Sequence, residues 1–197
     1  MQTYNSRACY SAQNNERFAR KAIMEYLYLD HAAATPMSTS VRAAMEPFES
    51  ELFFNPSSPY APAVHVRQAF ERARADLAHA IGGKPADVVL TAGATESINL
   101  AFSAAGEGHV ITTAIEHASV LACARQLPHT IVAVDERGRV APEAIEQAIQ
   151  PNTQLVSVGV ANNEIGTVQP IRAISQVVRA ERLRRLQEGS TVPIFLH

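Results

Sequence analysis

The spacing of apolar and polar residues along the chain follows two different patterns. Short continuous runs of apolar residues predict buried strands at Tyr26–Leu29, Val88–Thr91, Val110–Thr113, Ile131–Val134, Leu155–Val160 and Pro193–Leu196. Stretches with apolar side chains three and four positions apart predict helices at Val64–Ile81, Thr95–Ala104, Ala118–Leu127, Pro142–Ile149 and Pro170–Leu186. Because strands and helices take turns, we predict the α/β class: a three-layer, mostly parallel sheet with helices on both faces.

Two helix ends carry signals of their own. Ser38 is suited to cap a further helix that runs toward Phe53, and we expect Pro47 to kink or divide that helix. Gly82 and Gly83 predict the end of the long helix that precedes the regular alternation.

Composition narrows the classes of function. With 197 residues, 47% of them hydrophobic, the chain is long enough to bury a core. Its net charge of −2 gives no electrostatic reason to expect a nucleic acid or an anionic membrane as partner. No apolar run approaches the roughly 18 residues of a membrane-spanning helix, and the start of the chain lacks the apolar centre of a secretory signal. We therefore expect a cytoplasmic protein and predict that residues 1–23 are a disordered extension.

Cysteine and lysine are both scarce. Cys9 and Cys123 form neither a disulfide framework nor a metal-binding spacing, so no metal site is predicted. Cys123 falls within a predicted helix, where we expect it to act as a small buried hydrophobe. The only lysines are Lys21 and Lys84.

The stretch Val88–Ile98 predicts a strand, a turn at Gly93 and a helix start. Unpaired N–H groups and the helix dipole make such a start a natural site for an anion. The Thr95 and Ser97 hydroxyls can add donors. The alternative is that these residues only cap the helix.

Three polar loops are predicted at one edge of the sheet. Gly93–Ser97, Glu116–Ser119 and Asn162–Gly166 each follow a predicted strand. Because parallel strands end on the same side of a sheet, the three loops can converge on one ligand. Taken singly, His117 can be a solvent-facing helix start, and Asn162–Gly166 can be a tight turn.

These loops, in this order, resemble those of cysteine desulfurases. The motifs on which this resemblance rests are Gly93-Ala94-Thr95-Glu96-Ser97, Thr113-Ala114-Ile115-Glu116-His117, Asn162-Asn163-Glu164-Ile165-Gly166, Leu29-Asp30-His31-Ala32-Ala33-Ala34-Thr35-Pro36 and Asn55-Pro56-Ser57-Ser58. Cysteine desulfurases belong to the class V aminotransferases, which are fold-type I pyridoxal-phosphate enzymes. The resemblance runs from about Tyr26 to His197, and its Asn-Asn-Glu-Ile-Gly loop points to the branch that serves iron–sulfur cluster assembly.

The resemblance implies a role for four residues. Ala94 and Thr95 would bind the phosphate of pyridoxal phosphate, His117 would stack on its ring, and Asn163 would hydrogen-bond its phenolic oxygen. The cofactor serves as an electron sink. The family converts L-cysteine to alanine and passes the sulfur on as a persulfide. The implied partners are a second copy of the chain and a sulfur acceptor or iron–sulfur scaffold.

The resemblance also implies that the chain is truncated. Pro193–His197 resembles the strand that leads to the family's ring-nitrogen aspartate, and the Schiff-base lysine and persulfide cysteine would follow. Lys84 is no substitute, because the predicted strand Val88–Thr91 would hold it on the order of 13 Å from the ligand edge. We therefore expect this chain to be inactive, with no catalytic residue present and weak or absent cofactor binding. Residues 24–62 would contribute to a small domain and the active-site entrance, and residues 63–197 would form an incomplete cofactor-binding domain.

Two other readings stay open. The chain can belong to another class V relative, such as a selenocysteine lyase. It can also be a non-catalytic fragment that acts by dimerisation or by binding a partner. An ordinary nucleotide-binding domain is disfavoured, because the chain has no Gly-x-Gly-x-x-Gly or Walker pattern.

Overall fold

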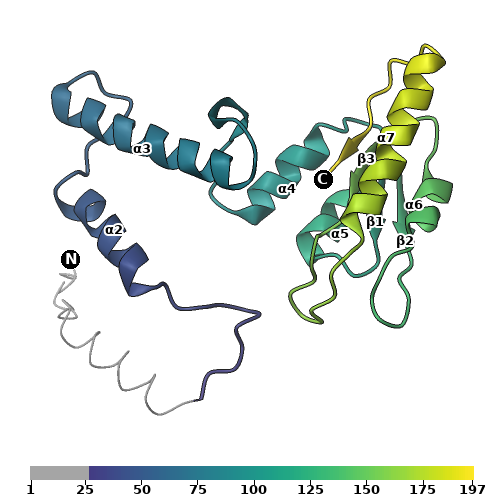
Figure 1. Cartoon of the computed structure of the whole chain (residues 1–197), viewed down its shortest axis with the longest axis horizontal. Helices are drawn as coiled ribbons and strands as arrows, with labels where there is room; N and C mark the ends of the chain where they lie inside the picture. The colour runs from purple at the N-terminus through teal and green to yellow at the C-terminus, as the bar shows by residue number, and fades with distance from the viewer. Residues whose placement is uncertain (1–26) are drawn as a thin grey trace, which may run out of the picture. The chain divides into compact units, whose positions relative to one another are not determined.

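The structure is a computed structural model and describes residues 27–197. The predicted disordered extension (residues 1–23), Cys9 and Lys21 lie outside the described residues. The chain falls into two compact units, of which the first ends at Phe54 and the second runs from Asn55 to His197. Figure 1 shows the chain.

The described part of the first unit contains helix α2 (Thr39–Ser50). The Ser38 hydroxyl caps it by accepting a hydrogen bond from the Val41 N–H at 3.3 Å, as predicted. The helix continues through Pro47, so of the two expected effects, a kink or a division, the division does not occur. The strand predicted at Tyr26–Leu29 is also absent, since residues 27–29 are exposed and unpaired among the described residues.

The second unit begins with the long helix α3 (Ala61–Ala80). Gly82 has a φ of +73°, and the Gly83 N–H donates to the Ala78 carbonyl at 2.8 Å. The left-handed conformation at Gly82 ends the helix where the sequence predicted. The short 3-10 helix η1 (Pro85–Asp87) follows and packs against α3.

Four parallel strands form the sheet of the second unit. They are β1 (His109–Thr113), β2 (His129–Val132), β3 (Thr153–Ser157) and β4 (Phe195–Leu196), in the spatial order β2-β1-β3-β4. Val110 pairs with His129 on one side of β1 and with Leu155 on the other. The predicted parallel sheet is therefore confirmed.

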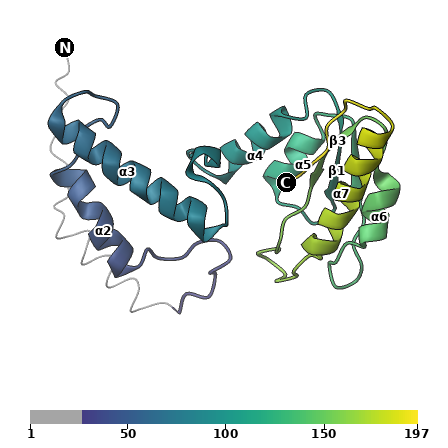
Figure 2. The ribbon, with the colours of Figure 1, turned by 45° about the horizontal axis from the view of Figure 1, so that its top comes forward.

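Helices cover both faces of this sheet. They are α4 (Ala94–Ser103), α5 (Ala118–Ala124), α6 (Pro142–Ala148) and α7 (Ile171–Gln187). Side chains alternate along each strand, so Val110 and Leu155 pack with α4 and α5, whereas Ile111 and Val156 pack with α6 and α7. Figure 2 shows α6 and α7 on one side of the strands and α5 on the other. The predicted three-layer α/β fold is confirmed. Cys123 is buried in the α4–α5 layer, as predicted.

The strand predicted at Val88–Thr91 is wrong. Val88 directly follows η1, Val89 is 75% exposed, and Leu90 is 50% exposed. A strand needs a neighbour to complete its ladder of hydrogen bonds, and no described segment pairs with these residues. The distance predicted between Lys84 and the ligand edge assumed this strand and is therefore no longer supported. Lys84 precedes η1 and is exposed.

Buried polar side chains hold the amino ends of the strands together. The imidazole of His109 lies 2.8 Å from the Thr153 hydroxyl and 2.9 Å from the Thr130 hydroxyl, so it connects β1 to β3 and β2. The Arg185 guanidinium of α7 donates to the carbonyls of Thr153 at 2.7 Å and of Gln150 at 3.0 Å. These contacts lie at the amino ends of the strands, opposite to the loops that follow β1 and β3.

Candidate functional site

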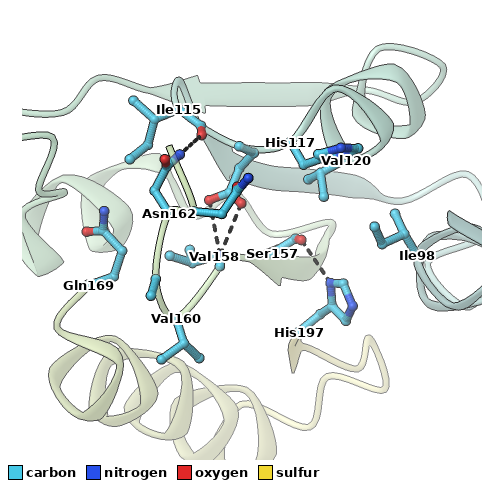
Figure 3. A pocket seen from close by; sticks show the side chains of 14 residues that line it. Ile98, Ile115, His117, Val120, Ser157, Val158, Val160, Asn162, Gln169 and His197 are labelled. Atoms are coloured by element: carbon cyan, nitrogen blue, oxygen red, sulfur yellow. Dashed lines mark hydrogen bonds between the residues drawn. The ribbon is translucent and has the colours of Figure 1, made fainter. Parts of the chain in front are cut away.

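A cavity lies beyond the carboxyl ends of β1 and β3. The chain leaves β1 toward α5 on one face of the sheet, and it leaves β3 toward α7 on the other face. The two connections therefore diverge between neighbouring strands, which is the place where open α/β sheets bind their ligands. The cavity has a volume of about 340 Å³ (Figure 3). Its lining residues are Ile98, Ile115, Glu116, His117, Val120, Ser157, Val158, Gly159, Val160, Ala161, Asn162, Asn163, Gln169 and His197.

His117 enters the cavity wall from the loop after β1. It is the N-cap of α5, and its Nδ1 atom accepts a hydrogen bond from the Ser119 N–H at 3.1 Å. The Ser119 hydroxyl also lies 2.6 Å from this nitrogen. Because Nδ1 is an acceptor, a neutral His117 ring carries its proton on Nε2. The cap thus fixes both the ring and its tautomer.

Two asparagines, Asn162 and Asn163, lie in the loop after β3, and Asn162 forms hydrogen bonds that build the loop. The Asn162 Oδ1 atom accepts hydrogen bonds from the N–H groups of Glu164 at 2.9 Å and Ile165 at 3.0 Å, which builds a tight turn. Its Nδ2 atom donates to the Ile115 carbonyl at 2.8 Å, as Figure 3 shows. Asn162 therefore builds the tight turn that was the alternative interpretation of this loop, and both Asn162 and Asn163 line the cavity.

Glu116 joins the two strand ends. Its Oε1 atom accepts a hydrogen bond from the Thr113 hydroxyl at 2.7 Å, and both carboxylate oxygens lie 3.1 Å from the Gly159 N–H. A β-carbon at Gly159 would lie 3.0 Å from the Oε2 atom. A glycine at this position therefore permits the close approach of the carboxylate.

His197 lines the cavity next to β3. Its Nδ1 atom lies 2.9 Å from the Ser157 hydroxyl, and its ring meets that of Phe102 edge to face, with centroids 6.3 Å apart. Partial burial beside these neighbours lowers the pKa of His197. The negative charge of Glu116 partly opposes that shift.

The start of α4 presents free donors. Among the described residues, no partner is found for the N–H groups of Ala94 and Thr95 or for the Thr95 hydroxyl. Glu96 turns back and accepts a hydrogen bond from the Ala92 N–H at 2.7 Å. Ala94 and Thr95 are exposed and do not line the cavity, but Ile98, one helical turn later, does.

The structure thus brings part of the predicted site together. His117 and Asn163 line one cavity, and Ala94 and Thr95 lie a turn away from it. Their contacts with a cofactor remain predictions. Sequence reasoning gave no individual role to Glu116, Ser157, Gln169 or His197, which all line the cavity. Glu116 does lie in one of the loops predicted to converge on a ligand, and His197 ends the quoted segment Pro193–His197.

Two kinds of site are absent from residues 27–197. They contain no group of three or more His, Cys, Asp or Glu side chains that could hold a metal ion. No helix among them is long and apolar enough to cross a membrane.

Comparison with known proteins identifies relatives. The aminotransferase class-V family profile matches residues 27–186. The chain is 40% identical over 164 residues to cysteine desulfurase IscS of Dictyoglomus turgidum, and the match covers 78% of this chain and 42% of that protein. Cysteine desulfurase IscS 1 of Archaeoglobus fulgidus is 41% identical over 162 residues, with 77% and 42% covered.

Solved structures give a similar picture. A structure described as a NifS-like protein superposes with a TM-score of 0.76 at 30% identity, covering 87% of this chain and 48% of that one. One described as SspA in complex with cysteine gives a TM-score of 0.75 at 36% identity, covering 79% and 48%. The chain therefore spans less than half the length of these relatives.

Proposed function

This chain belongs to the aminotransferase class-V family, and on that premise we propose that it is the amino-terminal portion of a pyridoxal-phosphate-dependent cysteine desulfurase. Relatives named cysteine desulfurase confirm the resemblance noted in the sequence. The activity itself is a proposal, because the match covers only 42% of those relatives. The observation that carries it is the cavity at the diverging ends of β1 and β3, which His117 and Asn163 both line.

The cavity suits a flat, partly polar ring. The side chains of Ile98, Val120 and Val158 give it apolar walls, and His117 and Asn163 add polar groups. Small-molecule sites commonly combine apolar walls with a few such groups. In the proposal, His117 stacks on the pyridine ring and Asn163 hydrogen-bonds its phenolic oxygen. Pyridoxal phosphate supplies an electron sink when bound.

The start of α4 suits the phosphate. The Ala94 and Thr95 N–H groups and the Thr95 hydroxyl are donors at the positive end of a helix dipole. The phosphate would therefore bind at α4, and the ring would extend toward Ile98 and the cavity. The residues of this chain bind and orient the group.

The finer parts of the proposal concern the whole protein. It would convert L-cysteine to alanine and pass the sulfur on as a persulfide to an acceptor or iron–sulfur scaffold, as a cytoplasmic homodimer. Residues 24–62 would contribute to a small domain and the entrance of the site. We propose that the 197-residue chain alone is inactive, because neither Lys84 nor Cys123 lines the cavity.

A second proposal is a non-catalytic role in binding a partner. Exposed apolar side chains favour it: Val89 is 75% exposed and Ile81 is 73% exposed. Size-exclusion chromatography of the purified chain distinguishes a self-associating fragment from a monomer. The selenocysteine lyase alternative is tested by comparing cysteine and selenocysteine as substrates of the full-length enzyme.

The cofactor assignment is tested with pyridoxamine 5′-phosphate, which cannot form a Schiff base with a lysine. We expect weak, saturable binding, with a Kd on the order of 1 mM or above. Thr95→Ala and His117→Ala should each weaken it, whereas the control Lys84→Ala should not. Saturable binding that neither Thr95→Ala nor His117→Ala weakens would place the ligand elsewhere. Release of alanine from L-cysteine by this chain with pyridoxal phosphate would refute its proposed inactivity.

A further inference from the structure

Each of the two cavity loops places a residue that cross-links the loops directly before a residue that is proposed to contact the cofactor, and all four line the cavity. Glu116 precedes His117 and reaches the loop after β3, while Asn162 precedes Asn163 and reaches back to the loop after β1. We propose that Glu116 and Asn162 are positioning residues that fix His117 and Asn163 across the cavity before a ligand binds. This inference rests on the proposed function, in which both of those residues contact the cofactor.

The two cross-links lie beyond the residues at which β1 and β3 pair with each other. The last residues at which β1 and β3 pair with each other are Thr112 and Ser157. Beyond them, no backbone hydrogen bond is seen between residues 114–117 and residues 158–162 of the described chain. The two loops continue into helices on opposite faces, so side chains must supply whatever holds them together.

Glu116 supplies the first cross-link. It spans 43 residues of sequence to the Gly159 N–H, with both oxygens at 3.1 Å. The Thr113 hydroxyl donates to the same carboxylate at 2.7 Å and fixes its direction. A hydrogen bond to a charged group is stronger than one between neutral groups. Because His117 is the next residue in the chain, this contact also constrains the position of His117.

Asn162 supplies the second cross-link and a turn with the same side chain. Its Nδ2 atom binds the Ile115 carbonyl across the cavity edge, while its Oδ1 atom holds the N–H groups of Glu164 and Ile165. Aspartate can make the turn contacts but cannot donate to Ile115. The substitution Asn162→Asp therefore removes the cross-link and spares the turn.

A pair of isosteric variants tests the inference in the 197-residue chain. Glu116→Gln keeps the shape of the side chain but sets an amide donor against the Gly159 N–H. Its control, Glu146→Gln, removes the same charge from an exposed side chain of α6 that does not line the cavity. Asn162→Asp is matched by Asn152→Asp, which makes the same change at an exposed position before β3.

Two readouts are followed: the NMR resonances of the His117 ring and the Asn163 side-chain amide, and the Kd for pyridoxamine 5′-phosphate. We expect Glu116→Gln and Asn162→Asp to shift or broaden those resonances and to weaken binding about tenfold under conditions where the protein stays folded. The two controls should match the wild type in both readouts.

The opposite pattern separates a merely structural role. Variants that lower the urea midpoint of unfolding, yet keep wild-type resonances and affinity, would overturn the inference. A wild-type chain that fails to bind pyridoxamine 5′-phosphate would count against the proposed cofactor site. The resonances of His117 and Asn163 would then still decide whether the cross-links hold the loops.

Discussion

Replacing Arg185 by methionine should destabilise the fold strongly. The Arg185 side chain is 4% exposed and pairs with the Glu181 carboxylate at 2.6 Å. It also donates to the carbonyls of Thr153 and Gln150 near the start of β3 and, at 3.3 Å, to the carbonyl of Val192 before β4. Methionine fills a similar volume and satisfies none of these groups.

The size of the effect follows from burial. Removing one partner of a buried ion pair costs about 3–5 kcal/mol. Here the Glu181 carboxylate loses one of its two arginine partners, and the carbonyls of Thr153 and Gln150 lose their donor. The free energy of unfolding of a domain is only about 5–15 kcal/mol. With a urea dependence of about 2 kcal/mol/M, the midpoint of unfolding should fall by roughly 2 M.

The adjacent Arg184 provides a matched control. It contacts the same Glu181 at 2.8 Å, but its side chain is 50% exposed, and exposed ion pairs contribute at most about 1 kcal/mol. Urea unfolding of Arg184→Met should therefore differ little from wild type. Equal losses for Arg184→Met and Arg185→Met, within about 0.5 kcal/mol, would refute the argument from burial.

Three further predictions concern the histidines and the cavity. Burial, and secondarily the charge of His129, lowers the pKa of His109. As the pH falls, this histidine therefore takes up its proton at a higher pH in the unfolded chain than in the folded one. The free energy of unfolding is highest above about pH 6.5 and decreases as the pH falls below that value. Urea midpoints at neutral and acidic pH should show this, and His109→Gln should reduce the dependence. Glu116→Gln should lower the pKa of His197 further, measured by NMR titration, because the Glu116 charge raises it; an unchanged pKa would contradict this. Gly159→Ala should displace the Glu116 carboxylate at a cost of about 1–3 kcal/mol, seen as a lower urea midpoint and weaker pyridoxamine 5′-phosphate binding; wild-type values of both would contradict it.

The helices and the sheet were predictable because their signals are local. Helix α3 and helix α7 have the periodicity of amphipathic helices, and the structure starts and ends them within a few residues of the predicted limits. Val88–Thr91 has an equally good strand pattern and forms no strand. The difference is that a helix completes its own hydrogen bonds, whereas a strand depends on a partner that the pattern does not specify.

The parts of the site that depend on the order of strands and loops along the chain were predictable. The contacts between side chains and residues far away in the sequence were not. Parallel strands deliver their loops to one edge, which placed His117 and Asn163 together. Both asparagines line the cavity and only Asn162 is seen to build the turn, a difference that neither the pattern nor the spacing of the residues predicts. Glu116 was missed as a cross-link because Gly159 lies 43 residues away. That contact requires β1 and β3 to be neighbours, which only the strand order reveals.

The two ends of the proposed cofactor site depend on different parts of the fold. His117 and Asn163 follow β1 and β3, so the sheet sets their positions. Ala94 and Thr95 begin α4, which packs on α5 through Phe102 and is not joined to the sheet by a strand at Val88–Thr91. The distance between phosphate donors and ring contacts is therefore set by the packing of α4 on α5 and on Val110 and Leu155 of the sheet. Substitutions in that helix interface should change the affinity for the phosphate end while leaving the two cross-links between the cavity loops intact.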